Sequence, residues 1–229
     1  MMENQKNLPQ HLGIIMDGNR RWAREKKLPL FEGHRQGGEV LKKITLVAKK
    51  RGIKILTFFC FSTENWQRPK NEVDYLMNLV HEAFLTWMSD FNKENIKVKV
   101  IGQKEVLPDR VKKEIEVVER ETSQNTRMTL NMALSYGGRA ELVDAIKKIV
   151  KKGIDPDKIT EDTVKENLWT SDVDLIIRTG GEQRLSGFLL WQAAYSEFLF
   201  VKKYWPDFDE NDLDAALADY ASRQRRFGK

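Results

Sequence analysis

Four short segments mix arginine, glycine and small polar residues, and each directly follows an apolar run that is typical of a β-strand. They span residues 17–22 (DGNRRW), 62–69 (STENWQRP), 135–139 (SYGGR) and 178–186 (RTGGEQRLS). Guanidinium groups, hydroxyls and free backbone N–H groups are the groups with which proteins bind phosphates. Asp17 is the lone acid of the first segment, and a divalent cation could bridge its carboxylate to a phosphate. The four segments therefore indicate a site for a phosphorylated ligand.

The apolar pattern predicts the elements that position these segments. Strands are expected at residues 12–16, 53–61, 96–101, 128–134, 173–177 and 198–201, and helices at 33–51, 71–92, 107–121, 139–151, 160–168 and 209–225. Alternating strands and helices predict an α/β fold with a mostly parallel central sheet of about six strands, flanked by helices. Ligands bind at the carboxyl ends of such strands, so all four segments are expected at one edge. Each segment alone is equally well explained as an ordinary turn.

Composition narrows the class of protein. The 229 residues carry a net charge of +5, which suits a protein that handles anions, and Cys60 is the single cysteine, which excludes an internal disulfide. We expect one domain over residues 1–229 with a flexible stretch at 1–10. With no signal-peptide pattern and no apolar run of membrane-spanning length, a cytoplasmic location is expected. Neither a G-x-x-x-x-G-K-[ST] loop nor a G-x-G-x-x-G turn is present, which argues against a P-loop or dinucleotide fold.

The same segments resemble the motifs of the cis-prenyltransferases, the family that includes the bacterial undecaprenyl diphosphate synthases and isoprenyl transferases. The matching stretches stand in the family's order and cover nearly the whole chain. They are HLGIIMDGNRRWA (11–23), FSTENWQRP (61–69), NMALSYGGR (131–139), RTGGEQRLSGFLLWQAAYSE (178–197), WPDFDE (205–210) and RRFG (225–228).

This resemblance implies a fold, a reaction and an assembly. The implied fold is undecaprenyl diphosphate synthase-like, with helices that enclose a hydrophobic tunnel, usually in a homodimer. The implied reaction condenses isopentenyl diphosphate units onto an allylic diphosphate such as farnesyl diphosphate, with Mg²⁺ as cofactor. The expected product is a long-chain polyprenyl diphosphate, undecaprenyl diphosphate, the lipid-carrier precursor for cell-wall synthesis. A shorter cis-prenyl product is the alternative. Transient membrane contact during product release is also expected.

The resemblance also implies roles for individual residues. Asp17 corresponds to the catalytic aspartate that works with Mg²⁺, and Glu197 to a second magnesium ligand. Asn65 corresponds to the residue that assists proton removal, although a neutral amide is a poor base. The residues expected to bind the two diphosphate substrates are Gly18, Asn19, Arg20, Arg21, Trp22, His34, Ser62, Thr63, Glu64, Trp66, Arg68, Arg178, Arg184, Leu185 and Ser186.

Leu30 departs from the family pattern, which commonly has arginine four residues before the His34 position. Leucine cannot bind phosphate, so either the affinity for the allylic diphosphate is weakened or Arg20 or Arg35 takes over the contact. Replacing Leu30 with arginine is then expected to lower the apparent KM for the allylic substrate, measured by steady-state kinetics. An unchanged KM would count against a lost contact at this position.

Two other classes of protein are alternatives to the enzyme. A non-catalytic partner subunit would be expected to lack Asp17 and the first arginine segment, and this chain has both. A nucleic-acid-binding domain would need a continuous basic face with stacking aromatic side chains. Here the arginines lie in glycine-containing segments after strands, so no nucleic-acid partner is expected.

Overall fold

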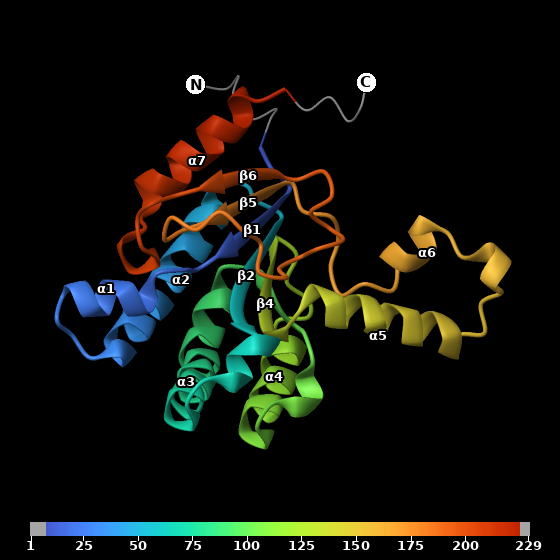
Figure 1. Cartoon of the computed structure of the whole chain (residues 1–229), viewed down its shortest axis with the longest axis horizontal. Helices are drawn as coiled ribbons and strands as arrows, with labels where there is room; N and C mark the ends of the chain where they lie inside the picture. The colour runs from blue at the N-terminus through green and yellow to red at the C-terminus, as the bar shows by residue number, and fades with distance from the viewer. Residues whose placement is uncertain (1–7, 225–229) are drawn as a thin grey trace.

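Six parallel strands form the centre of the computed structural model, which describes residues 8–224 (Figure 1). The strands are β1 (His11–Ile15), β2 (Ile55–Ser62), β3 (Ile96–Ile101), β4 (Met128–Tyr136), β5 (Leu175–Arg178) and β6 (Glu197–Phe200). Their order is β3-β4-β2-β1-β5-β6, and every neighbouring pair is parallel. The predicted α/β fold with a parallel sheet is confirmed. Most of the stretch expected to be flexible and the RRFG match lie outside the described residues.

Seven α-helices occur within the described range; six lie between strands, and α7 follows β6. They are α1 (Asn19–Glu25), α2 (Leu30–Lys50), α3 (Lys70–Lys93), α4 (Asp109–Glu121), α5 (Gly138–Lys151), α6 (Glu161–Lys165) and α7 (Glu210–Ser222). The sequence pattern did not predict α1. It placed the ends of α6 and α7 about three residues too late. No helix in this part of the chain is both long and apolar enough to span a bilayer.

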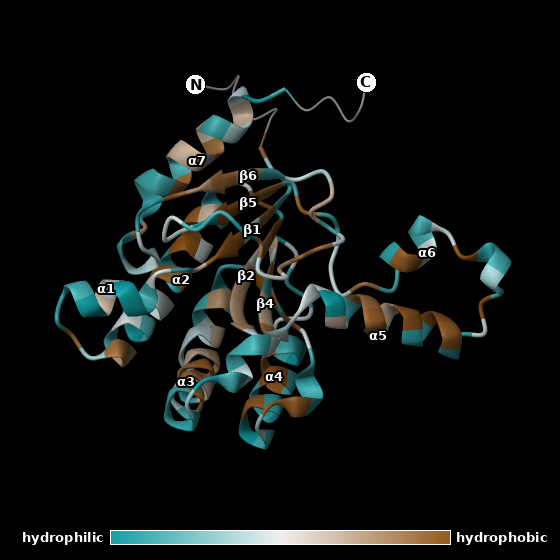
Figure 2. Cartoon of the chain, in the orientation of Figure 1, coloured by the Kyte–Doolittle hydropathy of each residue, from teal (hydrophilic) through white to brown (hydrophobic). Residues whose placement is uncertain are grey.

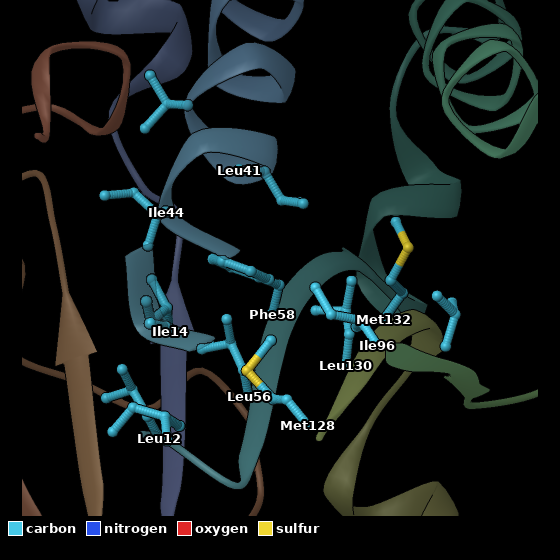
Figure 3. Close-up of a cluster of buried hydrophobic side chains, with 14 of the residues drawn as sticks. Leu12, Ile14, Leu41, Ile44, Leu56, Phe58, Ile96, Met128, Leu130 and Met132 are labelled. Carbon is cyan, nitrogen blue, oxygen red and sulfur yellow. The ribbon is translucent and has the colours of Figure 1, made fainter. Parts of the chain in front are cut away.

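The larger core lies between one face of the sheet and helices α2, α3, α4 and α7. Alternate residues of neighbouring strands, such as Leu12 and Ile14 of β1 and Leu56 and Phe58 of β2, point into it (Figure 3). Ile44 of α2 meets them from the helical layer. Because a strand directs successive side chains to opposite faces, this pairing leaves the intervening residues for the second face.

The second face is covered by residues 185–196, a stretch without helix, while α5 and α6 project to the side (Figure 1). Glu141 of α5 fixes this stretch from inside. Its buried carboxylate accepts hydrogen bonds from the Tyr136 hydroxyl, the Trp169 N–H (2.8 Å) and the Gln192 amide (2.9 Å). Burial raises the pKa of Glu141. The carboxylate therefore ties β4 and α5 to the cover of the second face.

A buried polar chain also crosses the second face. Asn131 donates to the Thr57 hydroxyl at 3.0 Å, and Thr57 Oγ1 lies 2.7 Å from His11 Nε2. His11 Nδ1 lies 2.9 Å from the carbonyl oxygen of Asp172, so this ring nitrogen is the donor and Nε2 the acceptor. Burial lowers the pKa of His11 to about 4. The imidazole is therefore neutral at pH 7.

This burial makes His11 a source of acid sensitivity. Its pKa is 6.5 in an unfolded chain and about 4 in the fold, so the unfolded state binds the extra proton first. The neutral His11 contributes its full stability above pH 6.5 and loses about 3 kcal/mol of it as the pH falls to 4. Urea unfolding of the wild type and His11→Asn should show most of this difference between pH 7 and 4.5. Equal pH slopes for the two proteins would contradict the assignment.

Candidate active site

The carboxyl ends of four strands meet at one edge of the sheet, as the sequence predicts. In the strand register, Ile15 of β1 lies opposite both Phe59 of β2 and Arg178 of β5. Further along β2, Ser62 lies opposite Tyr136 of β4. The polar segments that follow these four strands therefore share one edge.

An ion pair between Asp17 and Arg178 lies at the centre of this edge. Arg178 Nη2 donates to Asp17 Oδ2 at 2.9 Å, and Arg21 Nη2 lies 3.2 Å from Asp17 Oδ1. Arg178 is only 4% exposed, and its Nε has no hydrogen-bond partner. The backbone oxygen of Asp17 accepts from Trp205 N (3.0 Å) and from the Thr179 hydroxyl (2.7 Å). The carboxylate is thus held in place between two guanidinium groups.

A cavity of about 330 Å³ opens beside Asp17, and four arginines line it. Arg20, Arg21 and Arg24 come from α1 and Arg68 from the segment after β2; the other lining residues are Met16, Gly18, Asn19 and His34. Glu72 of α3 holds two of the guanidinium groups, at 3.1 Å from Arg68 and 3.8 Å from Arg20. Such a concentration of guanidinium groups around a small polar cavity suits a diphosphate.

His34 of α2 borders the arginine cavity as a neutral side chain. Burial, together with the charges of Arg68 and Arg20, lowers its pKa to about 4 against the opposing effect of Glu72. Its Nε2 is buried without a hydrogen-bond partner and lies 3.8 Å from Glu72 Oε1. This nitrogen is available to a ligand, since a buried polar atom otherwise costs free energy.

Glycines let the first segment approach its neighbours closely. Gly18 has φ +106°, and a Cβ there would lie 2.6 Å from the Tyr204 ring. On α2, a Cβ at Gly33 would lie 2.1 Å from the Asn19 carbonyl oxygen, and one at Gly37 would lie 2.4 Å from Asn19 Oδ1. Glycine at these positions lets the arginine-bearing helix pack directly on α2.

The second segment forms a 3₁₀ helix at Thr63–Gln67 that is fixed by its own cap. The Asn65 side-chain oxygen accepts from Ser62 N at 3.1 Å, which leaves its NH₂ group as a donor. Trp66 donates to the Ser135 hydroxyl at 2.9 Å, and Thr63 lies against the backbone of Gly137. These contacts join the second segment to the third.

The fourth segment wraps around the Arg178 guanidinium. Nη1 of Arg178 donates to the backbone oxygen of Arg184 and to the Ser186 hydroxyl at 3.0 Å. Ser186 has φ +52°, and Leu185 packs against the core of the second face. The exposed Arg184 pairs with Glu182 at 2.5 Å, and Glu182 lies 3.5 Å from Arg21. Arg178 thus organises the segment that carries Arg184 and Ser186.

An apolar cavity of about 360 Å³ adjoins the arginine cavity, and His34 lines both. Residues of α2 at i, i+3, i+4 and i+7 border it, namely His34, Gly37, Gly38 and Leu41; across from them α3 contributes Leu76, Leu79, Val80, Ala83, Thr86 and Trp87. Three charged residues of these helices also line it, namely Arg35, Glu39 and Glu82. Beyond Trp87 the two helices close over the buried Phe91 and the Lys42–Asp90 ion pair (2.6 Å). Helix α3, which corresponds to the helix predicted at 71–92, therefore lines this cavity.

Other predicted residues lie apart from this centre. Glu197 begins β6, three residues before Phe200, which is opposite Arg178; it lies about 10 Å from the active edge and pairs with Arg223 at 2.7 Å. The chain does not bring Glu197 and Asp17 together. Trp22 donates to Asp207 at 2.7 Å on the outside of α1, and Glu64 is exposed.

Two residues of the site were not singled out from the sequence. Arg24 was missed because helix α1 was not predicted. Glu72 was missed because an acid in the first turn of a helix is ordinary. The usable signal for Glu72 was its position four residues after Arg68, which faces it across one helical turn.

A cluster of three or more metal-binding side chains does not occur in the described part of the chain. Mg²⁺ is usually held by one or two carboxylates together with phosphate oxygens and water. The carboxylate of Asp17, at the rim of a cavity suited to a diphosphate, fits this mode of binding.

Comparisons with known proteins agree with this geometry. Residues 15–228 match the family model described as "Putative undecaprenyl diphosphate synthase". The chain is 49% identical to the isoprenyl transferase of Staphylococcus saprophyticus, over 97% of this chain and 90% of that protein. It is 46% identical to the isoprenyl transferase of Enterococcus faecalis, over 99% and 88%.

Two solved structures share the fold over nearly the whole chain. The lavandulyl diphosphate synthase from Lavandula x intermedia, in complex with dimethylallyl diphosphate, superposes with a TM-score of 0.94 at 38% identity and covers 98% of this chain and 100% of that one. A probable undecaprenyl diphosphate synthase from Campylobacter jejuni gives 0.85 at 33% identity, with 97% and 100% covered. The chain belongs to the isoprenyl transferase family, the cis-prenyltransferases that include undecaprenyl diphosphate synthase.

Proposed function

We propose that this prenyltransferase condenses isopentenyl diphosphate units onto an allylic diphosphate, with farnesyl diphosphate as starter, to give undecaprenyl diphosphate for cell-wall synthesis. The observation that carries the proposal is the junction of two unlike cavities at His34. One is polar and lined by arginines, and the other is apolar and lies between α2 and α3. Such a pair suits a molecule with a diphosphate head and a hydrocarbon tail.

In this proposal the arginine cavity binds the allylic diphosphate. Breaking the allylic C–O bond moves negative charge onto the leaving diphosphate, and Arg20, Arg21 and Arg68 stabilise that charge as it develops. Neutral His34 presents its unpartnered Nε2 to the same group. Mg²⁺, held by Asp17 and diphosphate oxygens, would add further charge stabilisation. Glu197 is left out of this metal site because Arg223 pairs with its carboxylate.

Isopentenyl diphosphate is proposed to bind at the fourth segment, where Arg178, Arg184 and Ser186 are gathered. Its double bond attacks the allylic cation, and one proton must then leave. The Asn65 oxygen is occupied by Ser62 N, so Asn65 acts as a donor that positions a diphosphate oxygen, and this oxygen takes the proton. The Arg178 guanidinium connects this pocket to Asp17, because its Nη1 donates to the fourth segment and its Nη2 donates to Asp17.

The product remains in the apolar cavity while it grows. The match to the family model described as "Putative undecaprenyl diphosphate synthase" and the fold shared with the probable undecaprenyl diphosphate synthase from Campylobacter jejuni support a long-chain product. A shorter product is the second candidate, and the cavity volume favours it. An apolar cavity of about 150 Å³ holds one six-carbon ring, so 360 Å³ corresponds to roughly fourteen carbon atoms unless the helices move apart.

Product mass after incubation with farnesyl diphosphate, labelled isopentenyl diphosphate and Mg²⁺ tests the proposal. We expect one main polyprenyl diphosphate and no series of intermediate lengths. A chelator should abolish its formation. The mass of the product distinguishes the long product from the short one. Geranyl and dimethylallyl diphosphate serve as alternative starters. Failure to form any product with all three starters would reject the proposed reaction for the isolated chain.

A homodimer is part of the proposal. Val143, Ile146 and Val150 are exposed apolar residues at i, i+3 and i+7, on one face of α5. They have the spacing of a helix face that packs on a partner. Light scattering is expected to give twice the chain mass of 26.7 kDa, and a monomeric mass would reject the dimer.

A further inference from the structure

The α1–α2 turn, taken here as the connection between the two helices with the first two residues of α2 (residues 26–31), combines exposed apolar and basic side chains. Leu28 is 41% exposed and Phe31 is 46% exposed, and Lys26 and Lys27 directly precede Leu28. Figure 2 shows hydrophobic residues at this projecting tip, where α2 begins. Apolar side chains surrounded by lysine are typical of a surface that lies in the interfacial region of a bilayer.

Backbone hydrogen bonds fix the conformation of this turn. The N–H of Leu28 donates to the Ala23 oxygen (2.8 Å), and the N–H of Lys27 donates to the Arg24 oxygen (3.0 Å). These are the two hydrogen bonds of a Schellman motif that ends α1. Because the backbone is tied down in this way, Leu28 is held outward at a fixed place.

Lys27 occupies the position in this motif where glycine is usual. Its φ is +54°, a conformation that costs lysine free energy and costs glycine none. Among the described residues, Lys27 makes no ion pair, since Lys26 is the neighbour that reaches Asp207 (3.6 Å). Because this cation is unpaired and its backbone is strained, we expect its charge to contact a partner outside the chain.

The surroundings of the turn add to its positive charge. Residues 24–35 contain four basic and two acidic side chains, a net charge of +2. Glu32 pairs with Arg35 at 2.9 Å, and Glu25 accepts from the Tyr204 hydroxyl at 2.6 Å. The acids are therefore engaged within the chain, while Lys27 faces outward.

The turn lies between residues that line the cavities, since Arg24 precedes it and His34 follows it. Phe31 packs against Tyr75 of α3 (ring centroids 5.5 Å apart), and Tyr75 donates to the Phe31 oxygen at 3.3 Å. His34, which lines both cavities, lies one helical turn after Phe31. A bilayer in contact with this turn would therefore lie near residues that line both cavities.

We propose that the α1–α2 turn is a docking surface for an anionic lipid bilayer. Lysine is depleted in protein–protein interfaces but enriched where proteins contact anionic lipid, so the Lys-Lys-Leu order favours lipid over a protein partner. The choice also rests on the proposed function, because a polyprenyl diphosphate must pass from the apolar cavity into a membrane. Two apolar side chains and a few charges give weak, reversible binding, which suits repeated release.

Flotation of the full chain, without substrates, with phosphatidylcholine vesicles that contain or lack phosphatidylglycerol tests the surface. The wild type should float with the anionic vesicles, less with the neutral ones, and less at high salt. The Leu28→Ser/Phe31→Ser variant should stay at the bottom. Lys27→Gly should bind about fivefold more weakly, because one lysine near the surface is lost, and yet melt at a higher temperature because strain is removed.

Two matched variants control for general effects. Val106→Ser removes an exposed apolar side chain elsewhere, and Lys113→Gln removes an exposed charge from α4; both should float as the wild type does. A wild type that does not float with anionic vesicles, or a Leu28→Ser/Phe31→Ser variant that floats equally well, overturns the proposal. Product formation is measured separately in solution. Flotation by a protein that forms no product would reject the proposed reaction and leave the docking surface standing.

Discussion

Replacing Asp17 with alanine is expected to lower turnover about a thousandfold, the size of effect seen when one preorganised group that stabilises transition-state charge is removed. The Asp17 carboxylate lies between the guanidinium groups of Arg178 and Arg21. It also lines the arginine cavity. Without it, Mg²⁺ loses its proposed protein ligand. The rate of product formation with saturating substrates measures the effect.

The Asp17→Asn variant separates catalysis from folding. Alanine leaves the buried Arg178 without its carboxylate partner, which we expect to cost about 2 kcal/mol, less than for a fully buried pair because Asp17 is partly exposed. Asparagine keeps a hydrogen-bond acceptor for Arg178 and should preserve most of the melting temperature, but it removes the charge. Turnover of Asp17→Asn near that of the wild type would reject Asp17 as the metal-binding acid.

Replacing Trp87 with alanine is expected to lengthen the main product by about one or two isoprene units, because the cavity then gains room comparable with the ~150 Å³ that holds a six-carbon ring. Trp87 is the last residue of α3 along the cavity before Phe91 and the Lys42–Asp90 pair close it. Mass spectrometry of the products measures the change. The prediction holds whether the wild type makes a short or a long product, since in either case the indole limits the volume.

Gly38 provides the opposite test from the facing wall. A Cβ at Gly38 would lie 3.7 Å from the Trp87 ring, so alanine fits and leucine would reach into the cavity. Gly38→Leu is therefore expected to shorten the product, and Gly38→Ala should stabilise α2 by up to about 1 kcal/mol. Trp87→Ala and Gly38→Leu proteins that both release the wild-type product would show that the cavity does not set product length.

The sheet was predictable because its signal is local. The strands with one or both faces buried are apolar over most of their length, and the long amphipathic pattern predicted α3 within one residue at each end. The topology rule then placed the four polar segments at one edge, which the register confirms. Helix α1 escaped prediction because NRRWARE is mostly charged and buries only Ala23.

The parts of the site that were not predictable depend on register and on pairing. The sequence places Glu197 just before the predicted strand 198–201 but does not show which strand it pairs with, and the parallel β5–β6 register places Glu197 away from Asp17. Likewise, the type of residue 65 does not reveal that its side-chain oxygen accepts from Ser62 N, so the sequence alone could not show that only its NH₂ group is left for a ligand. Such facts follow from distances between segments, which composition and periodicity do not contain.

Helix α2 fixes the spacing along the two cavities, since one helix face carries His34, which lines both cavities, and Leu41, which lines the apolar cavity two turns further on. A helix turns by about 100° per residue, so inserting or deleting one residue between these positions would turn everything beyond it away from the apolar cavity. Evolution of product length along α2 is therefore restricted to changes in side-chain size. A change in the register of this helix would separate the residues proposed to bind the head group from those proposed to bind the tail.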